Sequence, residues 1–213
     1  MKLILASNNA KKLAELQALF DGLGVTLQRQ GELGVSEAEE PHITFIENAL
    51  AKARHASAAT GLPSIADDSG LCVDALGGMP GVISAHYATV VARAGDELPR
   101  EVVRESQDAA NNALLLARMA DVENRRAAFV CTLVAIRSAD DPQPLVAVGR
   151  WDGEILRALE GEGGFGYDPL MFIPAFGATV AALAKDVKNA HSHRAVAAAQ
   201  MRGLMQQSWR LGR

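Results

Sequence analysis

Two adjacent carboxylates stand between apolar flanks in "SIADDSGLCV", residues 64–73. Asp67 and Asp68 follow the apolar pair Ile65 and Ala66, which predicts a buried strand. A carboxylate beside apolar neighbours loses hydration unless something positive or protic meets it. Mg²⁺ is a natural partner, because it takes oxygen ligands and is commonly held by one or two carboxylates plus substrate phosphates. Neighbouring strand residues point to opposite faces, so we expect one Asp to face a site and the other to be structural. The alternative is an Asp-initiated turn before Gly70.

The stretch "SNNAKK", residues 7–12, predicts a polar turn between a strand and a helix. Such a turn presents free backbone N–H groups and the positive end of the helix dipole to an anion. The side chains of Ser7, Asn8, Asn9, Lys11 and Lys12 suit a phosphate chain, although the glycines of a Walker motif are absent. A helix N-cap followed by two solvated lysines explains the same residues.

An acidic loop, "EAEE", spans residues 37–40. The side chains of such an acidic loop are ordinarily just solvated. They gain a metal-binding role only if the fold brings them to Asp67 and Asp68.

A glycine loop, "EGGFGYDP", spans residues 162–169. Glycines allow close backbone approach, and Phe165 and Tyr167 offer rings on which a nucleobase can stack. Asp168 can accept hydrogen bonds from a base edge. The alternative is a loop with two core aromatics.

Cations gather in "KNAHSHR", residues 188–194, at the start of a predicted helix. Cations oppose the dipole there, so we expect an anion nearby. His193 and Arg194 suit a base carbonyl or phosphates. A zinc site at His191 and His193 has poor support, because the two stand only two residues apart at a helix start.

Strands and helices alternate early in the chain, and strands follow one another in the middle. We predict strands at residues 2–6, 24–30 and 126–136, and helices at 10–20, 97–119 and from Asn189 or Ser192 onward. Thr44 and Glu47 form a capping box that opens a helix ending at Gly61. Residues 64–76 predict a strand, a turn and a short strand, and residues 143–156 a strand with a tight turn at Asp152-Gly153. This order indicates an α/β fold with a mixed sheet.

The composition suits one domain over residues 1–213, built as one body or two lobes. A net charge of −4 argues against a nonspecific nucleic-acid coat but permits a small phosphate site. Cys72 and Cys131 stand in apolar runs typical of core thiols. No segment has the length of a membrane span, and the apolar N-terminal run is too short for a signal peptide, so we expect a cytoplasmic protein without membrane partners.

Taken together, the stretches resemble one family. "ASNNAKKLAEL", "EAEE", "TFIENALAKARHA", "IADDSGLCVDALGGMPGVISAHYA", "GGFGYDPLMFIP" and "KNAHSHRA" occur in the order found in the inosine/xanthosine triphosphate pyrophosphatases, the house-cleaning enzymes of the HAM1/RdgB type. The resemblance runs from about residue 6 to residue 195.

The resemblance implies hydrolysis of ITP, dITP and XTP to the monophosphate and pyrophosphate with Mg²⁺. It also implies an elongated, twisted mixed sheet flanked by helices, two lobes with an active-site cleft, and a homodimer. It places metal ligands at Glu39 and Asp68, with Asp68 also catalytic. Substrate contacts fall on Ser7, Asn8, Asn9, Ala10, Lys11, Lys12, Ser69, Phe165, Gly166, Tyr167, Asp168, Lys188, His193 and Arg194.

Three departures from the family pattern stand out. Asn8 replaces a common glycine, which puts a close backbone approach in doubt. Residues 90–112 are longer than typical, and Met171 stands where a bulkier apolar or aromatic residue is common. Two other functions stay open: a related pyrophosphatase of the Maf type acting on dTTP and UTP, and a nucleotide- or RNA-binding module without turnover.

Overall fold

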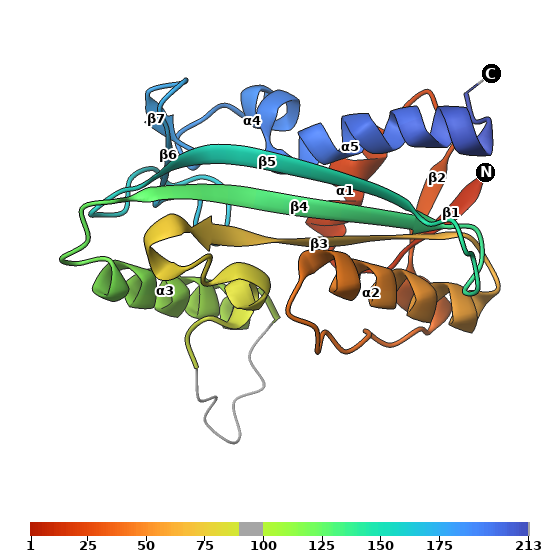
Figure 1. Ribbon diagram of the computed structural model, residues 1–213, viewed down its shortest axis with the longest axis horizontal. Helices are drawn as coiled ribbons and strands as arrows, with labels where there is room; N and C mark the ends of the chain where they lie inside the picture. Colours follow the sequence, from red (N-terminus) through yellow and green to blue (C-terminus); the bar gives the residue numbers. More distant parts are fainter. Residues whose placement is uncertain (90–99, 213) are drawn as a thin grey trace. The chain divides into compact units, whose positions relative to one another are not determined.

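The computed structural model describes residues 1–89 and 100–212 (Figure 1). The strands are β1 (Lys2–Leu5), β2 (Thr26–Arg29), β3 (Ser64–Val73), β4 (Arg126–Ile136), β5 (Leu145–Ile155), β6 (Met171–Ile173) and β7 (Ala178–Thr179). The α-helices are α1 (Ala10–Leu19), α2 (Phe45–Thr60), α3 (Arg100–Arg118), α4 (Lys185–His191) and α5 (His193–Leu204). Shorter helical turns are η1 (Gln30–Leu33), η2 (Asp74–Leu76), η3 (Gly81–His86) and η4 (Met205–Trp209).

The sheet has the strand order β2-β1-β3-β4-β5-β6-β7. Strand β1 pairs in parallel with β2 and β3, whereas β6 pairs antiparallel with β5 and β7. The predicted mixed α/β sheet is therefore confirmed. No helix among the described residues is long and apolar enough to cross a membrane.

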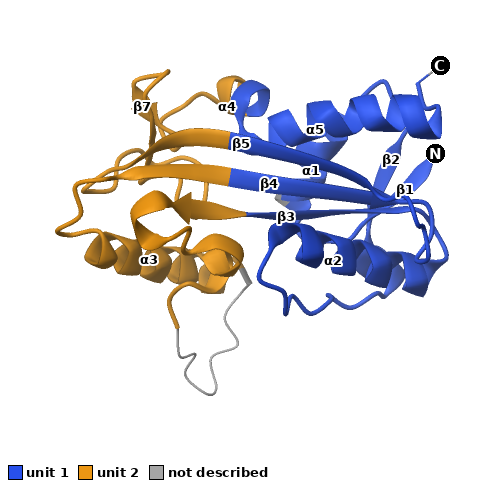
Figure 2. Cartoon of the chain, viewed as in Figure 1, with its two compact units in different colours: residues 1–69, 130–150, 189–213 blue, residues 70–129, 151–188 orange. Residues whose placement is uncertain are grey.

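The chain forms two compact units (Figure 2). Unit 1 comprises residues 1–69, 130–150 and 189–213, and unit 2 comprises residues 70–129 and 151–188. Strands β3, β4 and β5 contribute residues to both units.

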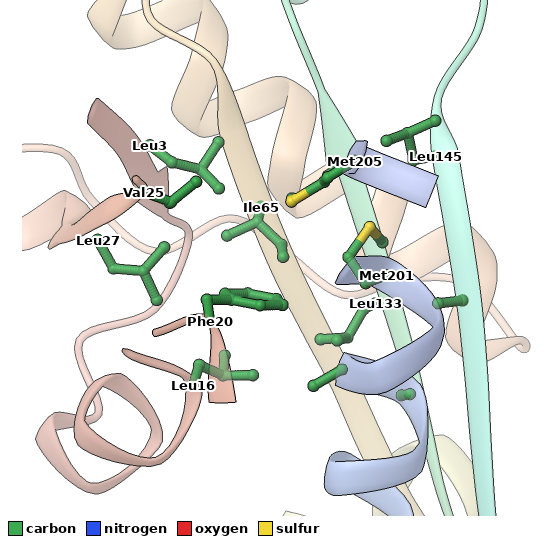
Figure 3. Packing of buried hydrophobic residues seen from close by; sticks show 14 of the residues in the cluster. Leu3, Leu16, Phe20, Val25, Leu27, Ile65, Leu133, Leu145, Met201 and Met205 are labelled. Atoms are coloured by element: carbon green, nitrogen blue, oxygen red, sulfur yellow. The ribbon is translucent and has the colours of Figure 1, made fainter. Parts of the chain in front are cut away.

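Unit 1 buries side chains on both faces of its strands. Leu16 of α1, Phe20 directly after this helix and Met201 of α5 pack with Ile65 on one face (Figure 3). Ala53 of α2 and its neighbours pack with Ala66 on the other face. Because strand side chains alternate, Asp67 follows Ile65 toward α1 and α5, and Asp68 follows Ala66 toward α2.

Helix α2 begins and ends where the sequence predicts. The backbone N–H of Glu47 donates to Thr44 Oγ1 at 3.3 Å, and the Thr44 hydroxyl lies 2.5 Å from Glu47 Oε2. Gly61 adopts the left-handed conformation (φ 66°) and closes the last turn. This capping box fixes the start of the helix that faces Asp68.

Two predicted turns are wrong, because β3 and β5 each run unbroken. In β3 the carboxylates of Asp67 and Asp68 have partners within unit 1, so no turn is needed to expose them to water. In β5, Gly153 serves close packing rather than a turn, since a Cβ there would stand 2.3 Å from the carbonyl oxygen of Phe172.

Helix α5 approaches β5 closely at Gly149. A Cβ on Gly149 would stand 1.8 Å from the carbonyl oxygen of His193. A residue without a side chain is required there. The glycine thereby brings the first turn of α5, which carries His193 and Arg194, against the sheet.

Unit 2 has its own core, in which Leu115 of α3 and Met119, directly after this helix, pack with Trp151, Tyr167 and Leu170. The predicted helix over residues 97–119 is confirmed from Arg100 to Arg118. The part of the long 90–112 stretch before residue 100 lies outside the described residues.

Candidate active site

Asp67 is the centre of a buried charge cluster in unit 1. Lys12 Nζ lies 2.8 Å from Asp67 Oδ1, and Arg194 Nε lies 2.7 Å from Asp67 Oδ2. The hydroxyl of Ser69 donates to Oδ1 at 2.7 Å. Burial by itself would raise the pKa of Asp67, but Lys12 and Arg194 outweigh it and hold the pKa well below its usual range. Both carboxylate oxygens of Asp67 therefore have partners within unit 1.

Arg194 is anchored by a second carboxylate as well. Its Nη1 lies 2.7 Å from Glu15 Oε2, and only 2% of the residue is exposed. These two anions are the ones expected beside cations at a helix start. The guanidinium thus contacts two protein carboxylates, and its contact with a base or a phosphate stays a prediction.

Asp68 lies on the opposite face of β3, against α2. Lys52 Nζ lies 2.7 Å from Asp68 Oδ1 and 3.3 Å from Glu40 Oε1. Asp68 Oδ2 is buried, and no hydrogen-bond partner for it exists among the described residues. The expectation that the neighbouring aspartates do different work therefore has a geometric basis.

The electrostatics of Asp68 differ from those of Asp67. Burial raises the pKa of Asp68 to about 6, with Lys52 opposing this shift and the neighbouring Glu40 carboxyl adding to it. Burial would lower the pKa of Lys52, but Asp68 outweighs that effect and raises it. A second cation at this pair would relieve both the burial cost and the carboxylate repulsion.

The residues at Asp68 suit a divalent cation. Two carboxylates, those of Asp68 and Glu40, share one lysine, and one buried carboxylate oxygen lacks a partner. Among the described residues, no three His, Cys, Asp or Glu side chains gather as a complete metal-ligand group. A cation here would need further oxygen ligands from substrate phosphates and water, as Mg²⁺ usually does.

The acidic loop meets Asp68 through a different glutamate from the one expected. Glu40 shares Lys52 with Asp68, although Glu39 and Glu40 are both exposed. Adjacent residues of an extended loop point in different directions, so the choice between two neighbouring glutamates depends on the fold. In the structure Glu40 is therefore the glutamate beside Lys52 and Asp68, and a metal-binding role for Glu39 stays a prediction.

The turn "SNN" caps α1. The backbone N–H of Asn9 donates to Ser7 Oγ at 3.2 Å, and that of Lys12 donates to Asn9 Oδ1 at 3.3 Å. Asn8 turns away from this cap, because its Oδ1 accepts from the Gly31 N–H at 2.9 Å and its Nδ2 donates to Glu37 at 3.1 Å. Its side chain therefore ties neighbouring loops together. Ala10 is exposed, and the side chain of Lys11 lies outside the described part of the chain.

The loop over residues 164–168, which we call the base loop, belongs to unit 2. Asp168 Oδ2 accepts from the Phe165 N–H at 3.0 Å and lies 2.5 Å from Lys188 Nζ. Lys188 Nζ also stands 4.8 Å from the centre of the half-buried Phe165 ring. A Cβ on Gly164 would lie 2.0 Å from Asp168 Oδ2, so this glycine lets the loop close over the carboxylate.

Tyr167 does not present its ring at the surface. Only 5% of the residue is exposed, it packs in the unit 2 core, and its hydroxyl donates to the carbonyl of Ser84 at 2.9 Å. Burial raises the pKa of the Tyr167 phenol. The two-ring stacking surface is thus corrected to one ring, that of Phe165, because an apolar ring inside a core cannot also stack on a ligand.

Two charged residues of the site, Lys52 and Glu15, were not predicted from the sequence. Both lie within helices, where a lysine or glutamate ordinarily points to water. Lys52 follows the N-cap Thr44 by eight positions, about two helical turns, which places it on the helix flank but does not reveal what it meets. His193 and Arg194 are both buried in the first turn of α5.

Known proteins resemble the chain over its whole length. The model of the Ham1 family matches residues 3–204. A "dITP/XTP pyrophosphatase" of Leptothrix cholodnii is 68% identical over 211 residues, covering 99% of this chain and 100% of that protein. The protein of the same name from Methylibium petroleiphilum is 65% identical, covering 98% and 99%. The solved structure of a HAM1 protein from Coxiella burnetii aligns with a TM-score of 0.86 at 40% identity, covering 98% and 100%.

Proposed function

Because the chain belongs to the Ham1 family, we propose that it is a nucleoside-triphosphate pyrophosphatase acting on deaminated purine nucleotides. Its substrates would be dITP, ITP and XTP, and its products the nucleoside monophosphate and pyrophosphate. The names of the relatives that share about two thirds of its residues support this substrate class. The observation that carries the proposal is Asp68, a buried carboxylate with one unpartnered oxygen beside Lys52 and Glu40.

The reaction needs a base and a cation near the α-phosphorus. Asp68 would accept the proton of the attacking water, whose oxygen bonds to the α-phosphorus while the bond from that phosphorus to the bridging oxygen breaks and pyrophosphate leaves. Lys52 would keep Asp68 oriented and its charge balanced. We propose Mg²⁺ as the cation, held by Asp68 and Glu40. When bound, it would neutralise phosphate charge and acidify a water.

Lys12 and the α1 cap would bind the triphosphate. Asp67 holds Lys12 at 2.8 Å, which orients its ammonium group beside the capped N-terminus of the helix. Ser69 also reaches Asp67, so the phosphate-side donors have one buried anchor in common.

Base selection would belong to the base loop of unit 2. Phe165 offers a stacking surface, and Lys188 offers a donor to a 6-keto oxygen. A 6-amino group is itself a donor and would face the Lys188 donor, so adenine nucleotides would be disfavoured. The homodimer, the cytoplasmic location, the cleft between two lobes and the single domain over residues 1–213 stay predictions, as does the absence of nucleic-acid and membrane partners.

Pyrophosphate release from ITP, XTP, dITP, GTP, ATP and dTTP, with Mg²⁺ and with EDTA, tests the proposal. We expect Mg²⁺-dependent release that is fast for the first three nucleotides. Release mainly from dTTP would replace the proposal with the Maf-type activity. The absence of release from every nucleotide would leave a binding protein.

A further inference from the structure

Helix α3 carries three polar residues at intervals of four. Arg104, Asp108 and Asn112 therefore lie on one face of the helix, one turn apart. All three meet the base loop within unit 2, at Phe165 or at Gly166. We call Arg104, Asp108 and Asn112 the α3 row.

Both polar groups of the Gly166 backbone are bound by the α3 row. Its N–H donates to Asp108 Oδ2 at 2.8 Å, and its carbonyl accepts from Asn112 Nδ2 at 2.9 Å. Gly166 has a left-handed backbone (φ 60°), which a regular strand ladder does not accommodate. Side chains of α3 thus supply the hydrogen bonds that a neighbouring strand would otherwise give.

The first member of the row acts on the ring instead of the backbone. The Arg104 guanidinium carbon lies 5.5 Å from the centre of the Phe165 ring. This distance falls within the range of a cation–π contact. Phe165 is thereby held through both its ring and the peptide that follows it.

A second row on α3 secures the segment behind the loop. Asn111 donates to the carbonyls of Ser84 and Ala85 at 3.2 and 3.1 Å, and Gln107 donates to that of Ala88 at 2.7 Å. The Ser84 carbonyl also receives the Tyr167 hydroxyl. The base loop is therefore braced from α3 directly and through residues 84–88.

The burial of Asn112 costs folding free energy. Only 6% of it is exposed, and its Oδ1 has no hydrogen-bond partner among the described residues. A buried unpaired acceptor costs free energy that a leucine would not. The cost is consistent with a role for the amide in holding Gly166 rather than in stabilising the core.

We propose that the α3 row positions the base loop and so sets the affinity of the protein for the base of its substrate. This inference rests on the proposed function. It gives the described part of the long 90–112 stretch a task, because Arg104, Asp108 and Asn112 all belong to it. Arg104, Asp108 and Asn112 are positioning residues, since each acts on the ligand through Phe165 or Gly166.

Asp108 offers a matched pair of variants for the test. Asp108→Ala removes the acceptor for the Gly166 N–H, whereas Asp108→Asn keeps an oxygen that can accept it. Glu105→Ala changes an exposed residue of the same helix and is the control. Asn112→Leu removes the hydrogen bond to the Gly166 carbonyl at similar side-chain volume. If this variant does not fold, the comparison of Asp108→Ala with Asp108→Asn still tests the inference.

Three measurements are made on each variant: hydrogen exchange, the kinetics of ITP hydrolysis and inhibition by tripolyphosphate. Hydrogen exchange of residues 164–168 in the free protein should be about tenfold faster in Asp108→Ala and Asn112→Leu, and unchanged in Asp108→Asn and Glu105→Ala. For the two disruptive variants, KM for ITP should rise about tenfold with kcat within about twofold, as expected for lost ground-state binding. Inorganic tripolyphosphate has no base, so its inhibition constant should be the same in the variants as in the wild type.

Wild-type exchange in Asp108→Ala would overturn the inference. The inference would also be overturned if a variant lost as much affinity for tripolyphosphate as for ITP. Such a result would mean that the substitution disturbs the whole site and not the base loop alone. A wild-type protein that releases no pyrophosphate would contradict the proposed function instead, and the exchange measurement would still decide whether the row holds the loop.

Discussion

On one face of β3, Asp67 meets two cations and a hydroxyl, whereas on the other face Asp68 meets one lysine and a second carboxyl group. The two residues are neighbours in sequence, are of the same type and are both buried. The pKa of Asp67 lies well below its usual range, and that of Asp68 is raised to about 6. The opposite shifts follow from the partners that each face supplies.

This difference gives the two carboxylates different capacities. A carboxylate such as Asp67, with two close cations and a hydroxyl, already has its hydrogen-bond partners and serves to hold them in place. A carboxylate with an unpartnered oxygen can still bind a cation or accept a proton. Neighbouring positions on one strand thus supply both kinds of group, because the helices on the two faces carry different residues.

Removing the carboxylate of Asp68 should have the largest effect. Asp68→Asn should lower kcat for ITP by roughly 10³-fold, within the range of a lost general base. Its unfolding midpoint in urea should not fall, because an amide is cheaper to bury than a charge. Initial rates of pyrophosphate release measure this, with the partly exposed Asp74→Asn as control. A decrease of less than tenfold would assign the chemistry to another residue.

Removing the carboxylate of Asp67 should chiefly affect stability. Asp67→Ala leaves the buried guanidinium of Arg194 short of one partner, which should cost about 3–5 kcal/mol of unfolding free energy. Breaking the exposed Arg29–Glu32 pair with Glu32→Ala should cost less than about 1 kcal/mol. Urea titrations compare the two variants. Equal losses would mean that Asp67 is not the anchor proposed here.

The pH dependence of stability should distinguish the two faces in metal-free buffer. Asp68 has a folded pKa of about 6, above its ordinary 3.8, so the folded state binds this proton more tightly than the unfolded chain does. Its stabilising contribution is complete below about pH 4 and is lost as the pH rises through about 6.

Asp67 should act in the opposite direction. Its folded pKa is lowered, so its contribution is present above its unfolded pKa and is lost as the pH falls through the folded value. Urea midpoints between pH 4 and pH 7.5 should decline less steeply with rising pH in Asp68→Asn than in the wild type. Parallel curves would show that Asp68 has no raised pKa.

The smallest expected effect concerns Asn8, beside the cap of α1. Asn8→Ala removes the bonds to the Gly31 N–H and to Glu37, and should cost about 1–2 kcal/mol of unfolding free energy. Urea unfolding measures the cost, and exchange of residues 30–37 should quicken. An unchanged urea midpoint would mean that Asn8 is a solvated turn residue whose hydrogen bonds do not stabilise the fold.

Local patterns determined much of the fold. The Thr44–Glu47 capping box and Gly61 set both ends of α2, since caps depend on residues within a turn of each other. Strand alternation correctly assigned Asp67 and Asp68 to different faces. The turns expected in β3 and β5 were wrong, because charges and glycines that suggest turns locally were accommodated by distant partners.

What each polar residue contacts was decided only by the tertiary structure. Asp67 pairs with Arg194 across 127 positions, and Asn112 with Gly166 across 54. Periodicity shows which face of an element a residue occupies, but it carries no information about which other element packs there. The sequence by itself determined the aspartate pair, the capped helices and the family resemblance. The fold placed Glu40 beside Lys52, buried Tyr167 and brought α3 to the base loop, because these outcomes depend on packing between distant segments.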